Sequence, residues 1–310
     1  MVAIKTEGLT KDYQVGFWQR KVRVLHDLNL EVLQGEIFGY LGPNGAGKTT
    51  TLKLLNGLVF PTSGRAWILG KELPDVGIKV QIGFLPENPY FYDYLTGREF
   101  LVFYGRLFEQ SRKVLRERVQ QLLRQVGLEG AADLQLRKYS KGMLQRIGLA
   151  QALINDPLLV ILDEPMSGLD PIGRREVKDL ILRLKAEGKT ILFSSHIIPD
   201  VEMICDRVGI LVGGRLVKVG RLEEMLQVEI ESVEVTASGV SDGLLGLIQR
   251  YASKPLVRSG DRVLICVRDE ETLQEVLKFL VEAKARVHSV LPHRRSLEDY
   301  FLREVGGGGV

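Results

Sequence analysis

Cysteine is scarce in this chain of 310 residues, which contains only Cys205 and Cys266. Neither has a second cysteine or a histidine nearby at the spacing of a metal site, and a disulfide framework is excluded. Both thiols lie in apolar runs, so we expect them to be buried thiols of a protein from a reducing compartment.

Long hydrophobic runs are also absent. The longest unbroken aliphatic stretch is residues 158–162, far below the roughly 18 to 20 residues that cross a bilayer. Residues 1–10 lack the apolar core of a signal peptide. We therefore expect a soluble, cytosolic chain whose role at any membrane depends on another subunit.

Neither sign of charge dominates. The chain has 42 Lys and Arg against 39 Asp and Glu, a net charge of +3, which is too small to indicate a nucleic-acid partner. The composition of 45% hydrophobic and 26% charged residues is typical of globular proteins and excludes disorder and fibres. The length corresponds to two domains of roughly 150 residues each.

Strand and helix patterns divide the first 222 residues, which we interpret as one domain, into three regions. Aliphatic and β-branched runs at 2–7, 22–25 and 28–33 predict a small antiparallel sheet. From residue 37 onward, apolar strands alternate with helical periods, which predicts an α/β fold with a parallel-sheet core. Residues 96–156 carry apolar residues at three-to-four spacing and predict a helical subdomain.

A weaker, more alternating pattern follows residue 222. The order strand, helix, strand, strand, helix, strand predicts a small α+β domain of ferredoxin-like type at about residues 228–305. Ser296 with Asp299 resembles a capping box that begins a last short helix, and the four glycines at 306–309 predict a flexible tail. This second domain would be either regulatory or dimerising.

Residues 42–49 fit the phosphate-binding pattern G-x-x-x-x-G-K-[ST], after a predicted strand and at the opening of a helix. The glycines let backbone N–H groups turn toward phosphates, and the helix N-terminus favours an anion. Lys48 would neutralise phosphate charge, and the Thr49 hydroxyl would ligate Mg²⁺; a plain glycine-rich turn is the alternative. The residues predicted to bind nucleotide here are Gly42, Pro43, Asn44, Gly45, Ala46, Gly47, Lys48, Thr49 and Thr50.

Asp163 and Glu164 directly follow the apolar run 158–162. Their carboxylates would emerge at the carboxyl end of a strand, where open α/β sheets bind ligands. Asp163 would hold Mg²⁺ through water, and Glu164 would act as general base toward the attacking water. Acids after a strand are common, so surface carboxylates are the alternative, but the phosphate-binding loop upstream favours a catalytic pair.

With these motifs the chain resembles the ATP-binding subunits of ABC transporters, over residues 2 to about 221. Tyr13 matches the aromatic residue that stacks on adenine, although an ordinary edge-strand tyrosine is the alternative. Residues 139–143 match the signature loop, residues 167–170 match the D-loop, and His196 matches the switch histidine.

The resemblance implies a P-loop ATPase with ATP and Mg²⁺ as cofactors and with Lys48, Glu164 and His196 in catalytic roles. It also implies a head-to-tail dimer, as homodimer or heterodimer. In such a dimer, the γ-phosphate bound at the P-loop of one subunit would contact the signature loop of the partner subunit. The signature residues are Ser140 and Gly142 here, and the resemblance also assigns Asp170 to nucleotide binding. Ser140 also suits the N-cap of a following helix.

Two departures from the family pattern stand out. The signature reads Tyr-Ser-Lys-Gly-Met, which keeps the serine and the second glycine and places Lys141 between them; we expect that side chain to face solvent. Glu87 stands where the family has glutamine. Its carboxylate can still ligate Mg²⁺ but cannot donate a hydrogen bond.

These features resemble the exporter branch of the family, whose membrane partners are permeases of the ABC-2 class. The chain would then lie at the cytoplasmic face of the cell membrane, held there by the permease. The aromatic run 90–94 is either a docking surface for that partner or packing inside the helical subdomain. Phe17 and Trp18 are expected to cover the rim of the nucleotide pocket or a local core.

An ABC-type ATPase that acts without a membrane partner is the alternative function. It predicts tandem ATP-binding halves, a long coiled coil or a basic surface, and none of these features is present in the sequence.

Overall fold

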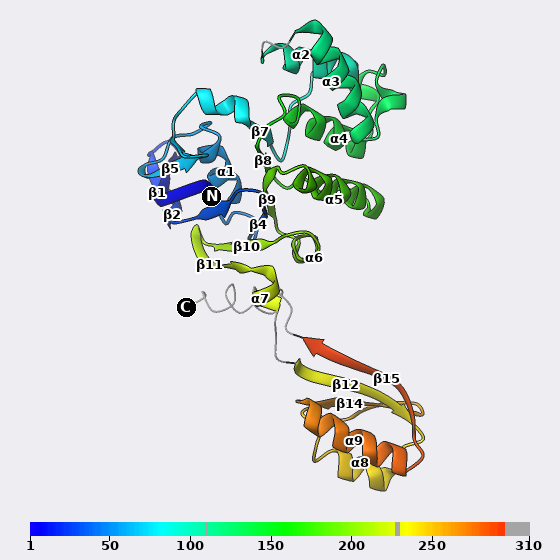
Figure 1. Ribbon diagram of the computed structural model, residues 1–310. Coiled ribbons are helices and arrows are strands. Elements are labelled where there is room, and N and C mark those ends of the chain that lie inside the picture. Colours follow the sequence, from blue (N-terminus) through cyan, green and yellow to red (C-terminus); the bar gives the residue numbers. More distant parts are fainter. Residues whose placement is uncertain (109–110, 227–229, 295–310) are drawn as a thin grey trace. The chain divides into compact units, whose positions relative to one another are not determined.

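The apolar runs after residue 36 form one six-stranded sheet (Figure 1). Its strands are β4 (Ile37–Leu41), β7 (Ile82–Leu85), β8 (Leu159–Leu162), β9 (Thr190–Ser195), β10 (Arg207–Val212) and β11 (Arg215–Arg221). The order is β11-β10-β4-β9-β8-β7, and all neighbours are parallel except β11 and β10. Every residue of β4, β8 and β9 is buried, as expected for strands of a parallel sheet covered on both faces.

The computed structural model describes residues 1–108, 111–226 and 230–294. The chain divides into two compact units, Met1–Leu222 (unit 1) and Glu223–Val310 (unit 2), and each is described by itself. Within the described ranges, no helix combines the length and the apolar character needed to span a membrane.

A second, antiparallel sheet in unit 1 confirms the prediction for the first 33 residues. Its strands are β1 (Val2–Val15), β2 (Arg20–Leu28), β3 (Glu31–Leu33), β5 (Ser63–Ile68) and β6 (Lys71–Glu72). Its order is β2-β1-β5-β6, with β3 paired to β1. The hairpin of β1 and β2 extends well beyond the predicted strands, because its polar outer half is held by backbone pairing from Tyr13↔Val22 to Val15↔Arg20 rather than by an apolar pattern.

One hydrophobic core joins the two sheets of unit 1. Ile4 and Leu25 of the antiparallel sheet and Phe38 and Tyr40 of β4 belong to the same buried cluster as Leu52 of helix α1 (Lys48–Leu55). Helix α1 is thereby fixed directly behind the loop that precedes it. Two further helices of unit 1 follow strands of the parallel sheet: α5 (Pro171–Ala186) and α6 (Ile198–Glu202).

The predicted helical subdomain consists of α2 (Gly97–Arg106), α3 (Arg112–Gln125) and α4 (Lys141–Ala152). Each helix begins at a side-chain cap: Thr96 accepts from Glu99 N, Ser111 from Val114 N, and Ser140 from Met143 N. The prediction that Ser140 is an N-cap is therefore confirmed. These caps satisfy N–H groups that a helix leaves without partners in its first turn.

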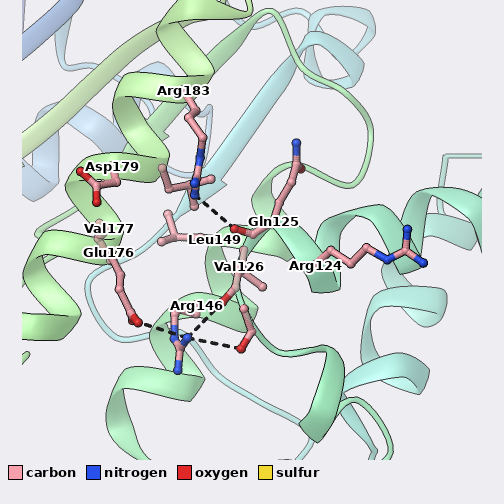
Figure 2. A pocket seen from close by; sticks show the side chains of 11 residues that line it. Arg124, Gln125, Val126, Arg146, Leu149, Glu176, Val177, Asp179 and Arg183 are labelled. Carbon is pink, nitrogen blue, oxygen red and sulfur yellow. Dashed lines mark hydrogen bonds and ion pairs between the residues drawn. The ribbon is translucent and has the colours of Figure 1, made fainter.

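Arg146 connects α4 to both α3 and α5 (Figure 2). Its guanidinium donates to Val126 O at 3.2 Å, just past the end of α3, and lies 3.4 Å from the Glu176 carboxylate on α5. Arg183 on α5 donates to Gln125 O at 3.3 Å. Cations at the carboxyl end of α3 suit its dipole. These residues line a cavity of about 260 Å³, and their hydrogen bonds and ion pair connect the helical subdomain to the parallel-sheet core.

Unit 2 has the predicted ferredoxin-like order. Its elements are β12 (Ile230–Ser238), α8 (Asp242–Ile248), β13 (Val257–Ser259), β14 (Arg262–Val267), α9 (Glu270–Glu282) and β15 (Arg286–Arg294), after a short helix α7 (Leu222–Leu226). The sheet order β13-β14-β12-β15 is antiparallel throughout. The helix expected from Ser296 and the tail at 306–309 lie outside the described residues.

The two cysteines have different surroundings. Cys205 is buried, as expected, and burial raises the pKa of its thiol well above the ordinary value. Cys266 is only half-buried, which corrects the expectation for it: its neighbours Ile265 and Val267 in β14 face the core of unit 2, and strand alternation turns Cys266 to the opposite face.

The buried ion pair between Lys178 on α5 and Asp200 on α6 gives a test of this packing. Its atoms lie 2.8 Å apart, with side chains 12% and 3% exposed. Lys178→Met is expected to lower the free energy of unfolding of unit 1 by about 3 kcal/mol, because a buried carboxylate loses its close partner. A urea titration followed by tryptophan fluorescence measures this, since Trp18 and Trp67 both lie in unit 1.

Lys185→Met is the matched control, because its pair with Asp206 is about a third exposed. It is expected to cost less than about 1 kcal/mol. Equal losses in the two variants would contradict the importance assigned to the buried pair.

Candidate functional site

The loops at the carboxyl ends of β4, β7 and β8 meet around one cavity of about 440 Å³ in unit 1. Parallel strands direct these loops to the same edge of the sheet. The cavity is lined by Val24, Pro43, Asn44, Gly45, Ala46, Gly47, Lys48, Thr49, Thr50, Glu87 and Glu164. Residues that are up to 140 positions apart in the sequence thus share one space, and nearly all of the predicted phosphate-binding loop is among them.

The N-terminus of α1 opens into this cavity without a side-chain cap. Among the described helices of eight or more residues, α2, α3, α4, α5 and α9 each have a capping side chain and α1 has none. Its first N–H groups are therefore available to a ligand, and the helix dipole favours a negatively charged one.

Gly47 makes the entry into α1 possible. Its φ of +105° is a backbone conformation that side chains disfavour, and an added Cβ would approach Leu25 to 2.8 Å and Val24 O to 3.0 Å. Glycine at this position therefore lets the loop lie close against strand β2.

Lys48 is buried at the bottom of the loop. Its Nζ donates to Gly42 O at 2.7 Å and to Pro43 O at 3.3 Å, and lies 3.2 Å from Glu164 Oε1. Only 6% of the side chain is exposed. This places one fixed positive charge beside the uncapped helix N-terminus, so the two features together form an anion site.

Glu164 contacts two basic side chains, one through each of its carboxylate oxygens. Its Oε1 faces Lys48, and its Oε2 lies 2.9 Å from Nδ1 of His196, the residue after β9. Its φ of +48° is uncommon for a glutamate, and its N–H donates to Ser194 Oγ at 2.9 Å. Strained backbone held by its surroundings is typical of functional positions, and here it directs the carboxylate into the cavity.

Asp163, the residue before Glu164, is fully buried. Ser194 Oγ donates to its Oδ1 at 2.7 Å, whereas Oδ2 has no hydrogen-bond partner among the described residues. Burial raises the pKa of this carboxyl, while the neighbouring Ser194 and Thr49 hydroxyls oppose the rise. A buried carboxylate oxygen without a partner is suited to a cation or to a water that a cation holds.

Ser194 is a site residue that no sequence motif singled out. It accepts from Glu164 N and donates to Asp163, and so fixes both acids at once. The residue lies inside a fully buried strand, where a serine by itself has no functional signature. Only the pairing of β8 with β9 makes its role visible.

Seven of the predicted site residues do not line this cavity. Gly42, Asp163 and His196 adjoin or contact residues that line it, and the other four are Tyr13, Ser140, Gly142 and Asp170. Ser140 and Asp170 cap α4 and α5, and Gly142 lies in the first turn of α4. Tyr13 is on β1, where the Lys11 ammonium lies 5.0 Å from its ring centre. Lys141 is exposed, as expected, and its ammonium lies close to Gly168.

The expectation for Phe17 and Trp18 is wrong. They line no part of the cavity and belong to no core: their side chains are 94% and 90% exposed. The turn between β1 and β2 holds them away from the rest of unit 1, because the hairpin pairs up to Val15↔Arg20 and leaves four residues beyond the last pair.

An uncapped helix N-terminus with a buried lysine, opposed by two acids that follow strand β8 of the same sheet, defines a P-loop nucleoside triphosphatase. Comparison with known proteins gives the family. The family model for ABC transporters matches residues 25–167. An ABC transporter ATP-binding protein of Synechocystis is 46% identical over 99% of this chain and 86% of its own length. The chain belongs to the family of ABC transporter ATP-binding proteins and is an ATPase.

Two further similarities are informative. The Nod factor export ATP-binding protein I of Rhizobium johnstonii is 35% identical over 98% of this chain and 95% of its own length. The ATP-binding cassette MJ0796, solved as a dimer in a post-hydrolysis state with ADP and Pi, has a TM-score of 0.65 and 27% identity. The similarity covers 71% of this chain and 98% of the MJ0796 chain.

The raised pKa of Asp163 predicts a pH-dependent gain in stability from Asp163→Asn. A raised carboxyl pKa means that the folded chain binds the proton more tightly than the unfolded chain, so stability is lost as the pH rises through the folded-state value. Without Mg²⁺ and nucleotide, the variant is expected to be more stable than the parent chain at about pH 8, because the amide carries no charge that burial would penalise. Urea titrations at about pH 5 and about pH 8 measure this difference.

Asp179→Asn serves as control for the loss of a carboxylate, because Asp179 is exposed on α5. It should not show the gain in stability expected of Asp163→Asn. A gain for Asp163→Asn that is absent at about pH 8 would contradict the cost assigned to the buried charge.

Proposed function

We propose that this ATPase is the nucleotide-binding subunit of an exporter, with Glu164 as the general base of ATP hydrolysis. The contact of Glu164 with both Lys48 and His196 is the observation that carries the proposal. A phosphate bound at the helix N-terminus would take Lys48 from Glu164 and leave its carboxylate free to orient water. His196 would then hold Glu164 from the other side as a hydrogen-bond partner.

We further propose that Mg²⁺ binds with the nucleotide. The unpartnered Oδ2 of Asp163, the Thr49 hydroxyl at the cavity wall and the Glu87 carboxylate are oxygen donors of the kind that Mg²⁺ prefers. No group of three or more His, Cys, Asp and Glu side chains within the described ranges forms a metal site by itself. This fits a cation that is held partly by the phosphates and by water. Its contribution would be to neutralise phosphate charge.

The chain is proposed to act as a head-to-tail dimer. Ser140, Gly142 and Asp170 lie outside the cavity of their own chain, although the first two cap or begin a helix that could present an anion site. A second copy or a homologous subunit would bring these groups to the nucleotide. The dimeric state of the similar MJ0796 cassette supports this arrangement.

A separate permease of the ABC-2 class is the proposed membrane partner, which would hold the chain at the cytoplasmic face of the membrane. The export role of the Rhizobium relative supports the direction of transport. Tyr90 and Tyr94 are 81% and 62% exposed, and their rings pack on Tyr92, which rests on Phe103 of α2. Phe91 packs inward on Phe100. The run is therefore anchored inside the subdomain and offers two tyrosines to a partner.

Glu164→Gln is expected to lower the ATP hydrolysis rate by about 100-fold or more, because the amide cannot accept the proton from water. Nucleotide affinity should stay near that of the parent chain, since the phosphate loop is unchanged. Steady-state turnover and binding of a fluorescent ATP analogue measure the two quantities. The control Glu187→Gln, on an exposed residue at the end of α5, should retain full turnover; undiminished turnover in Glu164→Gln would refute the general base.

The exporter proposal is tested by purifying tagged Glu164→Gln with ATP and Mg²⁺ from detergent-solubilised membranes. A polytopic membrane protein is expected to copurify in comparable amount, and adding Tyr90→Ser with Tyr94→Ser to this variant is expected to reduce its recovery. The same two substitutions in the parent chain, with Glu164 intact, are expected to leave ATP hydrolysis unchanged. Met203→Ser, also on an exposed apolar residue, is the control. Recovery of a bare homodimer would instead favour the ATPase without a membrane partner.

A further inference from the structure

The turn between β1 and β2 carries the two most exposed aromatic side chains in the described part of the chain. Phe17 is 94% and Trp18 is 90% exposed, and their rings pack edge to face with centroids 5.8 Å apart. The turn is closed by a backbone hydrogen bond from Gln19 N to Gly16 O, with Gly16 and Gln19 at positive φ. The backbone thus defines a projecting turn with an apolar end.

Positively charged residues follow this apolar end along β2. No acidic residue occurs between Asp12 and Asp27, whereas Arg20, Lys21 and Arg23 follow the turn closely. Arg23 is paired with Asp12 at 2.7 Å. Within the described residues, Arg20 and Lys21 have no ion-pair partner. The two cations nearest to the aromatic pair are therefore free to meet an external negative charge.

The shape of this element limits what it can bind. Two aromatic side chains on a four-residue turn offer far less than the roughly 800 Å² per partner of a stable protein interface. Aromatic side chains are favoured at the boundary between lipid tails and headgroups, and basic residues are attracted to anionic headgroups there. A protruding apolar end with cations behind it therefore matches a lipid surface better than a flat protein surface.

We propose that residues 16–21, the membrane turn, insert Phe17 and Trp18 into the headgroup region of a membrane rich in anionic lipid. Arg20 and Lys21 pair with the lipid phosphates. The nucleotide cavity is not involved, since neither aromatic residue lines it. The chain then has its own contact with the bilayer, in addition to any contact through a permease. The proposal does not depend on the exporter assignment and can be tested without a partner protein.

The chain contains two tryptophans, so fluorescence can be made specific for the turn. In the full-length Trp67→Phe variant, Trp18 is the sole tryptophan. Its emission is expected to shift to shorter wavelength with vesicles of equal parts phosphatidylglycerol and phosphatidylcholine, and to be quenched when the acyl chains carry bromine. Vesicles of phosphatidylcholine alone should give little change, because the electrostatic attraction is missing.

Vesicle cosedimentation of further full-length variants separates the two parts of the turn. Phe17→Ser with Trp18→Ser is expected to weaken binding to the mixed vesicles by at least about tenfold. Arg20→Gln and Lys21→Gln should each weaken it by about fivefold, and only when phosphatidylglycerol is present. ATP hydrolysis without lipid should be unchanged in all of them.

Matched controls remove an exposed aromatic side chain or an exposed cation elsewhere on unit 1. Tyr90→Ser removes an 81% exposed aromatic residue, and Arg175→Gln removes an exposed cation on α5; both should bind the vesicles like the parent. Three results would overturn the proposal: no shift of Trp18 with mixed vesicles, full binding by the Phe17 and Trp18 double variant, or equal losses in the controls. A shift of Trp18 emission that requires ATP rather than lipid would place the turn at the nucleotide pocket, and this result would also overturn the proposal.

Discussion

The site is built around one interaction, the contact of Glu164 with Lys48 at the carboxyl edge of the parallel sheet. The position of Glu164 depends on it. The two atoms lie 3.2 Å apart, yet the residues come from loops after different strands. Parallel pairing of β4 with β9 and of β9 with β8 brings those loops together. The antiparallel sheet and the shared core behind α1 then keep the lysine at a fixed depth. Under the proposed function, a nucleotide that binds here would exchange the Glu164 partner of Lys48 for a phosphate.

The site is assembled at a cost to the nucleotide-free fold. Asp163 is buried with an oxygen that has no partner, and burial raises its pKa. Glu164 has a backbone conformation that glutamate seldom adopts. Such features persist only where the surrounding structure enforces them. Here Ser194 does so through hydrogen bonds to both acids, so a buried strand residue fixes the geometry of the candidate site.

Local sequence signals predicted local structure well. The cap at Ser140, the fully apolar strands and the order of elements in unit 2 follow from side-chain chemistry within a few residues. The outer half of the β1–β2 hairpin and the strands β5, β10 and β11 were not predicted, since their polar or glycine-containing stretches become strands through pairing. Phe17 and Trp18 were misjudged for a related reason: an apolar side chain does not reveal whether the backbone carries it inward or outward.

The sequence by itself determined the chemistry of this protein: a glycine-rich loop before a helix, a lysine in its first turn, and two acids after a buried strand. These are local, because the spacing of a few residues decides which groups a loop can present. Only the tertiary structure decided which of those groups share one cavity, that Glu164 lies between Lys48 and His196, and that two aromatic residues are left in water. Strand order and backbone direction at turns control these outcomes, and both depend on contacts between residues far apart in the chain.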